Sequence, residues 1–321
     1  MIATIVLSCP FMPDYSIGLD LGGTNLRAAA VDRSGRIIQK VAGVTQLSAG
    51  REAVVEDMVA AIRNLEKSTG KGLAGIGIGV PGFIIMDKGL ITDSPNLPGF
   101  EDFPIRDEMS QKLGKPVILE NDANAAALGE KWMGAGREVD DLVLLTLGTG
   151  IGGGIIVAGK VLHGFVGMAA ELGHTTVNPT GNPCGCGNRG CLEKHASATA
   201  VTAMAKLMGL GDNVSSEAVY KLAADGNEKA RAIFKTMGEA LGIAIANLVS
   251  IFNFPLYLLS GGMLPAWDLF APAMLDECRR RSFVFRATKP RIDKAILGSE
   301  AGLFGAACLP FLTSDGRAPS H

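Results

Sequence analysis

Two hydrophobic periods alternate along the chain. Runs of apolar and β-branched residues predict buried strands, and windows with apolar residues every three or four positions predict helices. As far as Met133, the pattern predicts strands at Tyr15–Leu21, Leu26–Val31, Ile37–Val44, Leu73–Val80 and Pro116–Glu120, with helices at Arg51–Lys67, Ile105–Leu113 and Ala123–Met133.

The same order of elements starts again at Leu142. Both halves open with a strand, a glycine turn and a second strand, and this alternation predicts an α/β fold with helices covering parallel or mixed sheets. Two such halves facing each other would form a cleft for a ligand. The second half is predicted to contain strands at Leu142–Leu147, Ile155–Val157 and Leu256–Leu259 and helices at Ala196–Met208, Ser216–Ala224, Glu228–Ile251, Pro265–Arg281 and Ala301–Leu309.

Composition narrows the class of protein. The chain has 321 residues, of which 47% are hydrophobic, and a formal net charge of −2. It has no long basic run, so we expect neither a nucleic-acid partner nor a membrane surface. The apolar segment from Met1 to Met12 lacks the basic residues of a signal peptide, and we interpret it as an extension with Met12 as an alternative start. No stretch of about 18 uncharged apolar residues predicts a transmembrane helix, and we expect a cytoplasmic protein.

The first glycine turn follows Asp20. Gly22, Gly23, Thr24 and Asn25 would point backbone N–H groups into one concavity, which suits an anion such as a phosphate. Asp20, at the end of the strand, could hold a Mg²⁺ ion that carries the phosphate. An ordinary hairpin turn explains this segment equally well when it is taken alone.

The second glycine turn contains Gly148, Thr149 and Gly150. Together with Gly153 it matches the G-x-G-x-x-G pattern formally, but a strand rather than a helix is predicted to follow, so we reject a nicotinamide site. The chain has no Walker pattern. A second phosphate-binding hairpin therefore fits these residues better.

Polar side chains end the strand before the Ala123 helix. A carboxylate in Glu120-Asn121-Asp122 could accept a proton from a substrate hydroxyl, because ligand groups commonly lie at strand ends in α/β folds. The alternative is that Asn121 and Asp122 only cap the helix.

Three cysteines and one histidine predict a metal site. Nine residues separate His174 from Cys184, one separates Cys184 from Cys186, and four separate Cys186 from Cys191. Four such ligands suit a tetrahedral, structural Zn²⁺ with no open position. Redox-active or free thiols are the alternative. The scattered positions of the other cysteines argue against a disulfide framework.

Other features are less specific. Glu171 and Glu193 flank the metal loop, where a folded loop would fix them for hydrogen bonds to vicinal sugar hydroxyls; solvated surface glutamates are the alternative. Gly261 and Gly262 could admit a nucleotide close to the main chain or simply form a turn between strand and helix. We interpret His163 and His195 as packing or surface residues.

These motifs resemble a known family. Asp20–Arg27 is similar to the first phosphate motif of actin-like sugar kinases, and the segment from His174 to Glu193 resembles the zinc signature of the ROK family (repressors, open reading frames and kinases). Gly148–Ile156 and Leu192–Ala200 look most like its bacterial glucokinases. The resemblance implies two actin-like (ribonuclease H-like) domains around a central cleft: residues 1–121, completed by the helical segment 301–321, and residues 122–300 with the zinc loop 171–193.

The resemblance also implies roles for residues. Asp122 would be the catalytic base, ATP and Mg²⁺ would bind the two glycine turns with Gly261 and Gly262, and the family's members suggest a homodimer. The sugar would be held by Gly82, Asn96, Asn121, Asp122, Glu171, His174 and Glu193.

The expected activity is ATP-dependent phosphorylation of the 6-hydroxyl of glucose. Kinases for another hexose or an N-acetylhexosamine, a polyphosphate donor, and a non-catalytic sugar sensor stay open. A transcriptional regulator of the family would need a DNA-binding domain before the first phosphate motif, where 19 residues precede Asp20.

Overall fold

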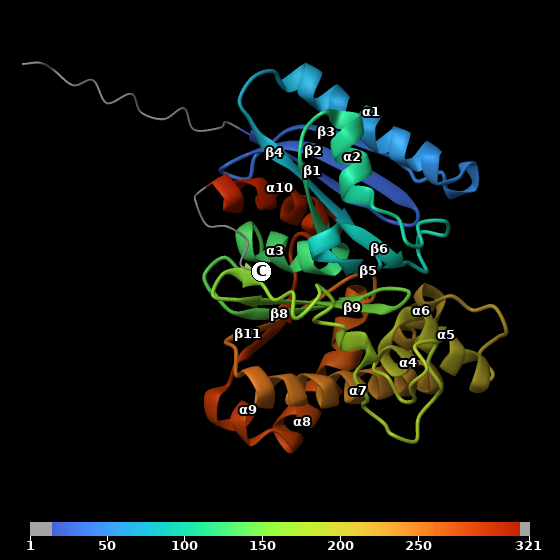
Figure 1. The fold of residues 1–321 in the computed structure, drawn as a ribbon. Coiled ribbons are helices and arrows are strands. Elements are labelled where there is room, and N and C mark those ends of the chain that lie inside the picture. Colours follow the sequence, from blue (N-terminus) through green and yellow to red (C-terminus); the bar gives the residue numbers. More distant parts are fainter. Residues whose placement is uncertain (1–14, 315–321) are drawn as a thin grey trace, which may run out of the picture.

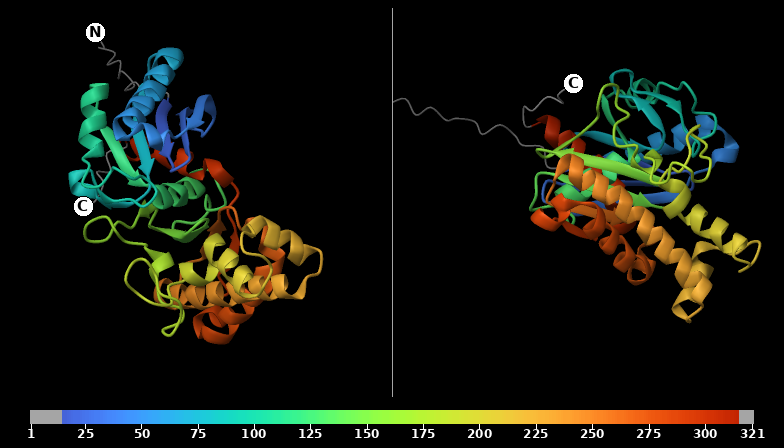
Figure 2. Two further views of the ribbon diagram at one scale, coloured as in Figure 1. Left: turned by 90° about the vertical axis from the view of Figure 1, so that its right-hand side faces the viewer. Right: turned by 90° about the horizontal axis from the view of Figure 1, so that it is seen from below.

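The computed structural model describes residues 15–314, which form two five-stranded sheets with helices between and outside them (Figures 1 and 2). Our expectations for the segment Met1 to Met12, with its alternative start, and for residues 315–321 fall outside the described residues.

The first sheet has the strand order β3-β2-β1-β4-β7. Its first three strands are antiparallel neighbours, while β4 pairs parallel with both β1 and β7. A small hairpin of β5 and β6 extends from the end of β4. The strands are β1 (Tyr15–Leu21), β2 (Asn25–Asp32), β3 (Ile37–Val44), β4 (Leu73–Val80), β5 (Phe83–Ile85), β6 (Leu90–Asp93) and β7 (Val117–Asn121).

Helices cover both faces of this sheet. Helices α1 (Arg51–Thr69) and α2 (Ile105–Leu113) pack on the outer face, and α10 (Ala301–Ser314) packs on the inner face across β1, β2 and β4 (Figure 1). A Cβ atom added to Gly77 would lie 1.9 Å from the carbonyl oxygen of Ala306. The missing side chain therefore lets α10 lie directly on the strand.

The second sheet repeats this topology with the order β10-β9-β8-β11-β12. Strand β8 pairs antiparallel with β9 and parallel with β11, as β1 does with β2 and β4. The strands are β8 (Leu142–Leu147), β9 (Ile151–Val157), β10 (Lys160–Val161), β11 (Leu256–Ser260) and β12 (Arg291–Lys294).

Alternate residues of the central strands face two different cores. Val143 and Leu145 of β8 pack with the outer helices, whereas Leu142 and Leu144 pack with α10 and α3 (Asp122–Trp132). This is the period of two expected for a strand buried on both faces. The outer layer contains α4 (Glu193–Ala196), α5 (Ala198–Leu207), α6 (Ser216–Ala224), α7 (Glu228–Phe252), α8 (Trp267–Arg281) and α9 (Phe283–Thr288).

Helices α3 and α10 pack against each other between the two sheets. Glycines allow the close approach: a Cβ atom on Gly129 would lie 2.0 Å from the carbonyl oxygen of Ala301, and one on Gly305 would lie 1.7 Å from that of Ala125. Because each helix also packs on one of the sheets, this pair joins the two halves of the molecule.

Most predicted elements are present, but the second glycine turn is shorter than predicted. Strand β9 begins at Ile151 rather than Ile155. Gly152, Gly153 and Gly154 therefore belong to the strand, and a Cβ atom on Gly154 would lie 2.6 Å from the Cβ of Ala127 in α3. Gly152 and Gly154 therefore let α3 lie close to the strand, whereas Gly153 leaves space for Leu172 on the other face. The pattern did not predict β5, β6, β10, β12, α4 or α9.

Within the described residues, α7 is long and apolar enough to cross a membrane by length and composition. However, 67% of its most apolar stretch is buried inside the protein. That burial is typical of a core helix, so the apolar character of α7 is explained by the core that it forms with the second sheet.

Candidate active site

The first glycine turn brings a carboxylate close to a helix start. Gly22 donates its N–H to the carbonyl oxygen of Asn25 over 2.8 Å, which closes the turn. Asp20 pairs with Arg27 across the hairpin, at 3.5 Å, and a Cβ atom on Gly302 at the start of α10 would lie 2.8 Å from Asp20 Oδ1. Burial, with the nearby charge of Asp122, raises the pKa of Asp20 to about 6.

Two candidate sugar-binding positions lie beside this turn. A Cβ atom on Gly23 would lie 2.8 Å from the carbonyl oxygen of Asn96, so the Asn96 loop lies directly on the turn. Gly82 follows β4 with φ of +117°, and a Cβ atom there would lie 2.6 Å from the carbonyl oxygen of Asp93. The backbone conformation and the lack of space therefore both require a glycine at position 82.

Asn121 and Asp122 divide the two roles that the sequence left open. Asn121 Oδ1 accepts from the N–H groups of Ala123 and Asn124, so Asn121 is the N-cap of α3, an interaction worth about 1 kcal/mol. Its Nδ2 donates to the carbonyl oxygen of Gly82 over 3.2 Å. A side-chain amide has two N–H donors, so one remains for a ligand.

Asp122 is the first residue of α3 and does not act as its cap. Its Oδ1 accepts from the N–H of Ala123 over 2.8 Å. Burial raises the pKa of the Asp122 carboxyl group above its usual range. A carboxylate with a raised pKa, placed between the two sheets, has the properties of a general base.

The second glycine turn is joined to the segment after the cysteine loop. Gly148 accepts at its carbonyl from the N–H of Ala198, and Thr199 Oγ1 donates to the carbonyl of Thr149 over 2.7 Å. Glu193 Oε2 accepts from the N–H of Ile151, at 3.1 Å. A Cβ atom on Gly150 would lie 2.3 Å from the same carboxylate oxygen, so Gly150 leaves the space that Glu193 occupies.

The turn after β11 also reaches this region. Gly261 has φ of +100°, and a Cβ atom there would lie 2.4 Å from the carbonyl oxygen of Leu147 at the end of β8. Gly262 is exposed and a Cβ atom on it would meet nothing within 4 Å. The backbone at Gly262 is therefore open to a ligand.

The four predicted metal ligands lie together. The ligand atoms of His174, Cys184, Cys186 and Cys191 are all within 4.8 Å of one another. Cys184 Sγ lies 3.6 Å from His174 Nδ1, and Cys186 Sγ lies 3.6 Å from Cys191 Sγ. Tetrahedral Zn–S bonds of about 2.3 Å place sulfur atoms roughly 3.8 Å apart. The site therefore fits Zn²⁺, and the five cysteines described are free of disulfides.

Charge links the metal loop to Asp122. Partial burial raises the pKa of Glu171, the neighbouring His174 opposes this rise, and the charges of Asp122 and Glu193 add to it. The carboxylates of Asp20, Asp122, Glu171 and Glu193 therefore form one negative region, to which both halves of the chain contribute.

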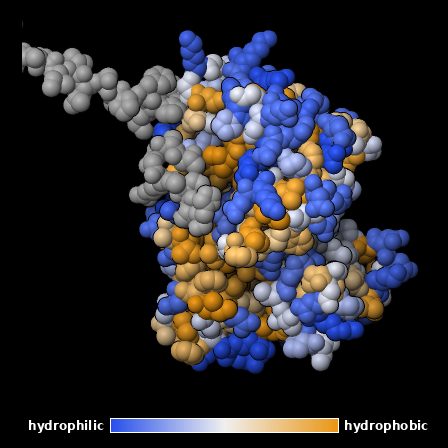
Figure 3. Space-filling model, viewed as in Figure 1, coloured by the Kyte–Doolittle hydropathy of each residue, from blue (hydrophilic) through white to orange (hydrophobic). Residues whose placement is uncertain are grey.

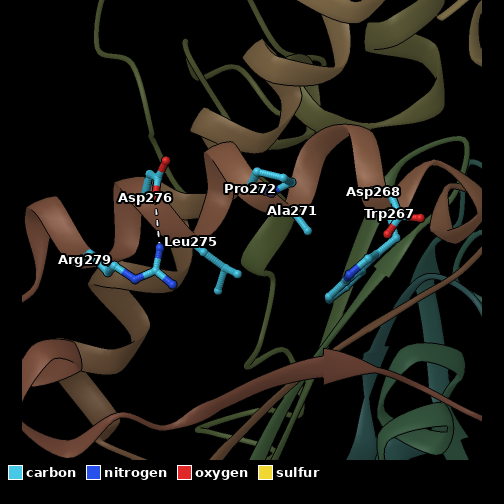
Figure 4. A pocket seen from close by; sticks show the side chains of 7 residues that line it. All are labelled: Trp267, Asp268, Ala271, Pro272, Leu275, Asp276 and Arg279. Carbon is cyan, nitrogen blue, oxygen red and sulfur yellow. Dashed lines mark hydrogen bonds and ion pairs between the residues drawn. The ribbon is translucent and has the colours of Figure 1, made fainter. Parts of the chain in front are cut away.

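Not every candidate joins this region by a recorded contact. Thr24 and Gly262 are exposed at the turns and have no recorded contact with another candidate, and Asn25 is joined to the region only through its carbonyl oxygen, which accepts the N–H of Gly22. A separate depression of about 420 Å³ lies along α8, lined by Trp267 and Arg279 among others (Figure 4). No candidate site residue lines this depression, so it is separate from the candidate active site.

The amino-acid sequence matches the model of the ROK family over residues 16–311. The chain belongs to the ROK family. It is 41% identical to a glucokinase of Thermotoga maritima over 270 residues, which cover 80% of this chain and 84% of the relative.

Solved structures of ROK proteins are similar as well. A ROK hexokinase from Thermus thermophilus superposes with a TM-score of 0.87 at 38% identity, covering 94% of this chain and 99% of that one. A ROK glucokinase from Streptomyces griseus, described in complex with glucose and AMPPNP, gives a TM-score of 0.75 at 34% identity, covering 92% and 98%. The predicted fold class of two actin-like domains is confirmed, whereas the predicted domain boundaries stay predictions.

Sequence reasoning missed Thr146 and did not find the partner of Glu120 beside the site. Thr146 Oγ1 accepts from the N–H of Gly152 at 3.1 Å. Thr146 holds the position in the second hairpin that is equivalent to that of Asp20 in the first. Glu120 is buried and contacts His163 Nε2 over 2.7 Å, although His163 had no predicted partner. No sequence signal connects Glu120 with His163, because 43 positions separate them.

Proposed function

We propose that this ROK protein is an ATP-dependent glucokinase that transfers the γ-phosphoryl group of ATP to the 6-hydroxyl of glucose. The position of Asp122 carries this proposal. Its carboxylate has a raised pKa and directly follows the buried strand β7, close enough to Asp20 of the first hairpin and to Glu171 for their charges to interact. The relatives named glucokinase, one of them with glucose and AMPPNP bound, support glucose as the acceptor.

Asp122 would act as the general base. It would accept the proton of the 6-hydroxyl as that oxygen attacks the γ-phosphorus, in line with the leaving ADP. Asn121 keeps one amide N–H for a sugar hydroxyl, and the carboxylates of Glu171 and Glu193 would accept hydrogen bonds from others. Asn96, His174 and the backbone of Gly82 complete the proposed sugar site.

The two glycine turns would hold the nucleotide. Backbone N–H groups at Gly22–Asn25 and Gly148–Gly150 would offset charge on the phosphate oxygens, and Gly261 and Gly262 would leave space for the nucleoside. Asp20 and Asp122 concentrate negative charge beside the first turn. Oxygen ligands of this kind fit Mg²⁺, which would neutralise phosphate charge when bound.

The Cys₃His site would hold a structural Zn²⁺ ion. His174 belongs both to this site and to the proposed sugar site, and Glu193 follows Cys191 by two residues. Zinc would therefore fix the sugar-binding carboxylates by fixing the loop that carries them. Replacement Cys186→Ser should lower the zinc content, the melting temperature and the affinity for glucose together; full glucose affinity in zinc-free protein would contradict this role.

We also propose a cytoplasmic homodimer. Hydrophobic side chains gather on the surface over α8 and α9 (Figure 3), where Phe283 is 72% exposed. Ile251 near the end of α7 is 70% exposed. Ser250 and Ser282, which directly precede Ile251 and Phe283, are hydrogen-bonded to each other over 3.1 Å, so the two exposed apolar residues lie in neighbouring segments. Light scattering of the purified protein would give the mass, and a monomer at micromolar concentration would contradict the proposal.

A coupled ADP-release assay tests the activity. With MgATP and a panel of hexoses, including N-acetylated ones, we expect turnover mainly with glucose. Preference for another hexose would change the substrate but not the reaction. Turnover with polyphosphate in place of ATP would change the donor. No turnover of zinc-loaded protein with any sugar and either donor would overturn the proposal.

A further inference from the structure

A buried carboxylate precedes the proposed base. Glu120, the fourth residue of β7, is 1% exposed. Its Oε1 accepts from the backbone N–H of Asn121 over 2.9 Å and from Asn124 Nδ2 over 3.1 Å. Glu120 therefore holds the strand end and the first turn of α3, between which Asp122 lies.

The second oxygen of Glu120 contacts a histidine from the other half of the chain. His163 Nε2 lies 2.7 Å from Glu120 Oε2. Because an ionised carboxylate can only accept, the Nε2–H of His163 donates. The hydrogen bond that His163 donates to Glu120 raises the pKa of His163, which favours the protonated imidazole.

His163 lies at the neck of a loop, residues 162–170, that we call the bridge loop. The N–H of Ala169 donates to the carbonyl of His163 over 3.1 Å, which closes the loop. The N–H of Met86 donates to the carbonyl of Val166, also over 3.1 Å, and Gly167 (φ of +108°) packs against Met86. The bridge loop is thus attached to the first half at two places, Glu120 and Met86.

The bridge loop leads directly into the proposed sugar site. Glu171 follows its last residue, and the short helical turn Leu172–His174 comes next. The contact between His163 and Glu120 therefore connects two groups that must act on the same sugar: the turn that presents Asp122 and the segment that presents Glu171.

We propose that His163 is a positioning residue for phosphoryl transfer, acting through Glu120 to hold the Asn121–Asp122 turn in register with the Glu171 segment. The inference rests on the proposed kinase activity. The role concerns the Nε2 of His163, which is engaged with Glu120. A small misplacement of a base relative to its substrate is enough to lower a rate by on the order of 100-fold.

Three variants test this inference in the full-length, zinc-loaded protein. In His163→Ala the donor is lost, and we expect kcat with glucose to fall by on the order of 10- to 100-fold, with KM for glucose raised and KM for MgATP unchanged. In His163→Gln an amide N–H can still donate to Glu120, and most of kcat should return. The matched control is Phe165→Ala in the same loop, because Phe165 is 100% exposed; it should have wild-type kinetics.

A double-mutant cycle separates positioning from general damage. If His163 acts through Glu120, then His163→Ala should lower kcat much less in a Glu120→Gln background than in the wild type. Rates are expressed per folded protein, from the melting curve and zinc content of each variant. If His163→Ala does not fold, His163→Gln and Glu120→Gln are compared with their double variant.

The outcomes distinguish this inference from the proposed function. A wild-type protein without kinase activity toward any hexose overturns the function. An active wild type with unchanged kcat in His163→Ala, no recovery in His163→Gln, or independent losses in the double variant overturns the positioning role alone.

Discussion

The two halves of the molecule share one topology but differ in chemistry at equivalent positions. In each half an antiparallel hairpin is followed by two parallel strands, in the orders β3-β2-β1-β4-β7 and β10-β9-β8-β11-β12. Each glycine turn is closed by an N–H of its first glycine, Gly22 to Asn25 over 2.8 Å and Gly148 to Gly150 over 3.0 Å. The topology is therefore repeated, although residues 22–25 form the first turn and the shorter segment 148–150 forms the second, and the side chains beside the turns also differ.

The penultimate residues of β1 and β8 show this difference. Asp20 faces Arg27 across the first hairpin, whereas Thr146 faces Gly152 across the second. Asp20 has a carboxyl group whose pKa is raised to about 6, while the Thr146 hydroxyl is neutral and accepts a hydrogen bond from a backbone N–H. The first half thus supplies the proposed cation-binding group, and the second supplies a neutral turn with the carboxylate of Glu193 beside it.

The helices after the last strands differ in the same way. Helix α3 begins with Asp122, the proposed base, and α10 follows Glu300, whose carboxylate pairs with Lys40 over 2.6 Å. A repeated fold has therefore placed acidic residues at both helix starts, and only one of them is free of a cationic partner among the recorded interactions of residues 15–314.

The largest expected effect is that of Asp122→Asn. Loss of the general base should lower kcat by on the order of 10²- to 10⁴-fold while glucose still binds, because the amide keeps the shape of the side chain. The matched control, Glu300→Gln at the start of α10, removes an ion pair and should change kcat less than a few-fold. Steady-state kinetics and glucose binding by calorimetry check both, and comparable losses in the two variants would remove the asymmetry between the halves.

The next effect compares Asp20→Asn with Thr146→Val. Removing the Asp20 charge should raise KM for MgATP and lower kcat, together by on the order of 10- to 100-fold, because a proposed cation ligand is lost. Thr146→Val should instead cost about 1 kcal/mol of stability through one lost hydrogen bond, with a much smaller kinetic change. Titration with Mg²⁺ at fixed ATP measures the first effect and thermal unfolding the second; equal Mg²⁺ dependence in both variants would contradict the comparison.

The sequence predicted the repeated topology and the metal site because their signals are local. Strand, glycine turn and strand are contiguous, and the four ligands lie within one loop. The sequence could not distinguish glycines that bind a phosphate from those that admit a helix, such as Gly154 beneath Ala127. It also could not pair Glu120 with His163, because that contact exists only once the bridge loop crosses to the first half.

The pH dependence should also follow the charges of the first half. The pKa values of Asp20, at about 6, and of Asp122 are raised, so both groups take up protons at higher pH than ordinary carboxyls do. Activity needs the ionised forms and is therefore lost as the pH falls through about 6. We expect kcat/KM, which reports the free enzyme, to be about tenfold lower at pH 5 than at pH 7. A profile that stays flat down to pH 4.5 would show that neither carboxylate titrates in this range.

The smallest effect compares the two glycine turns themselves. A Cβ atom on Gly150 would lie 2.3 Å from Glu193 Oε2, whereas one on Gly22 would lie 3.4 Å from the nearest atom, the carbonyl oxygen of Asn25. The end of a glutamate side chain can move, so Gly150→Ala should displace the Glu193 carboxylate without unfolding the turn. We expect KM for glucose to rise by roughly 3- to 10-fold, as one hydrogen-bonding group is misplaced, with the melting temperature nearly unchanged. Gly22→Ala should leave KM for glucose at its wild-type value. Equal KM values for glucose in the two variants would mean that Glu193 does not depend on the second turn for its position.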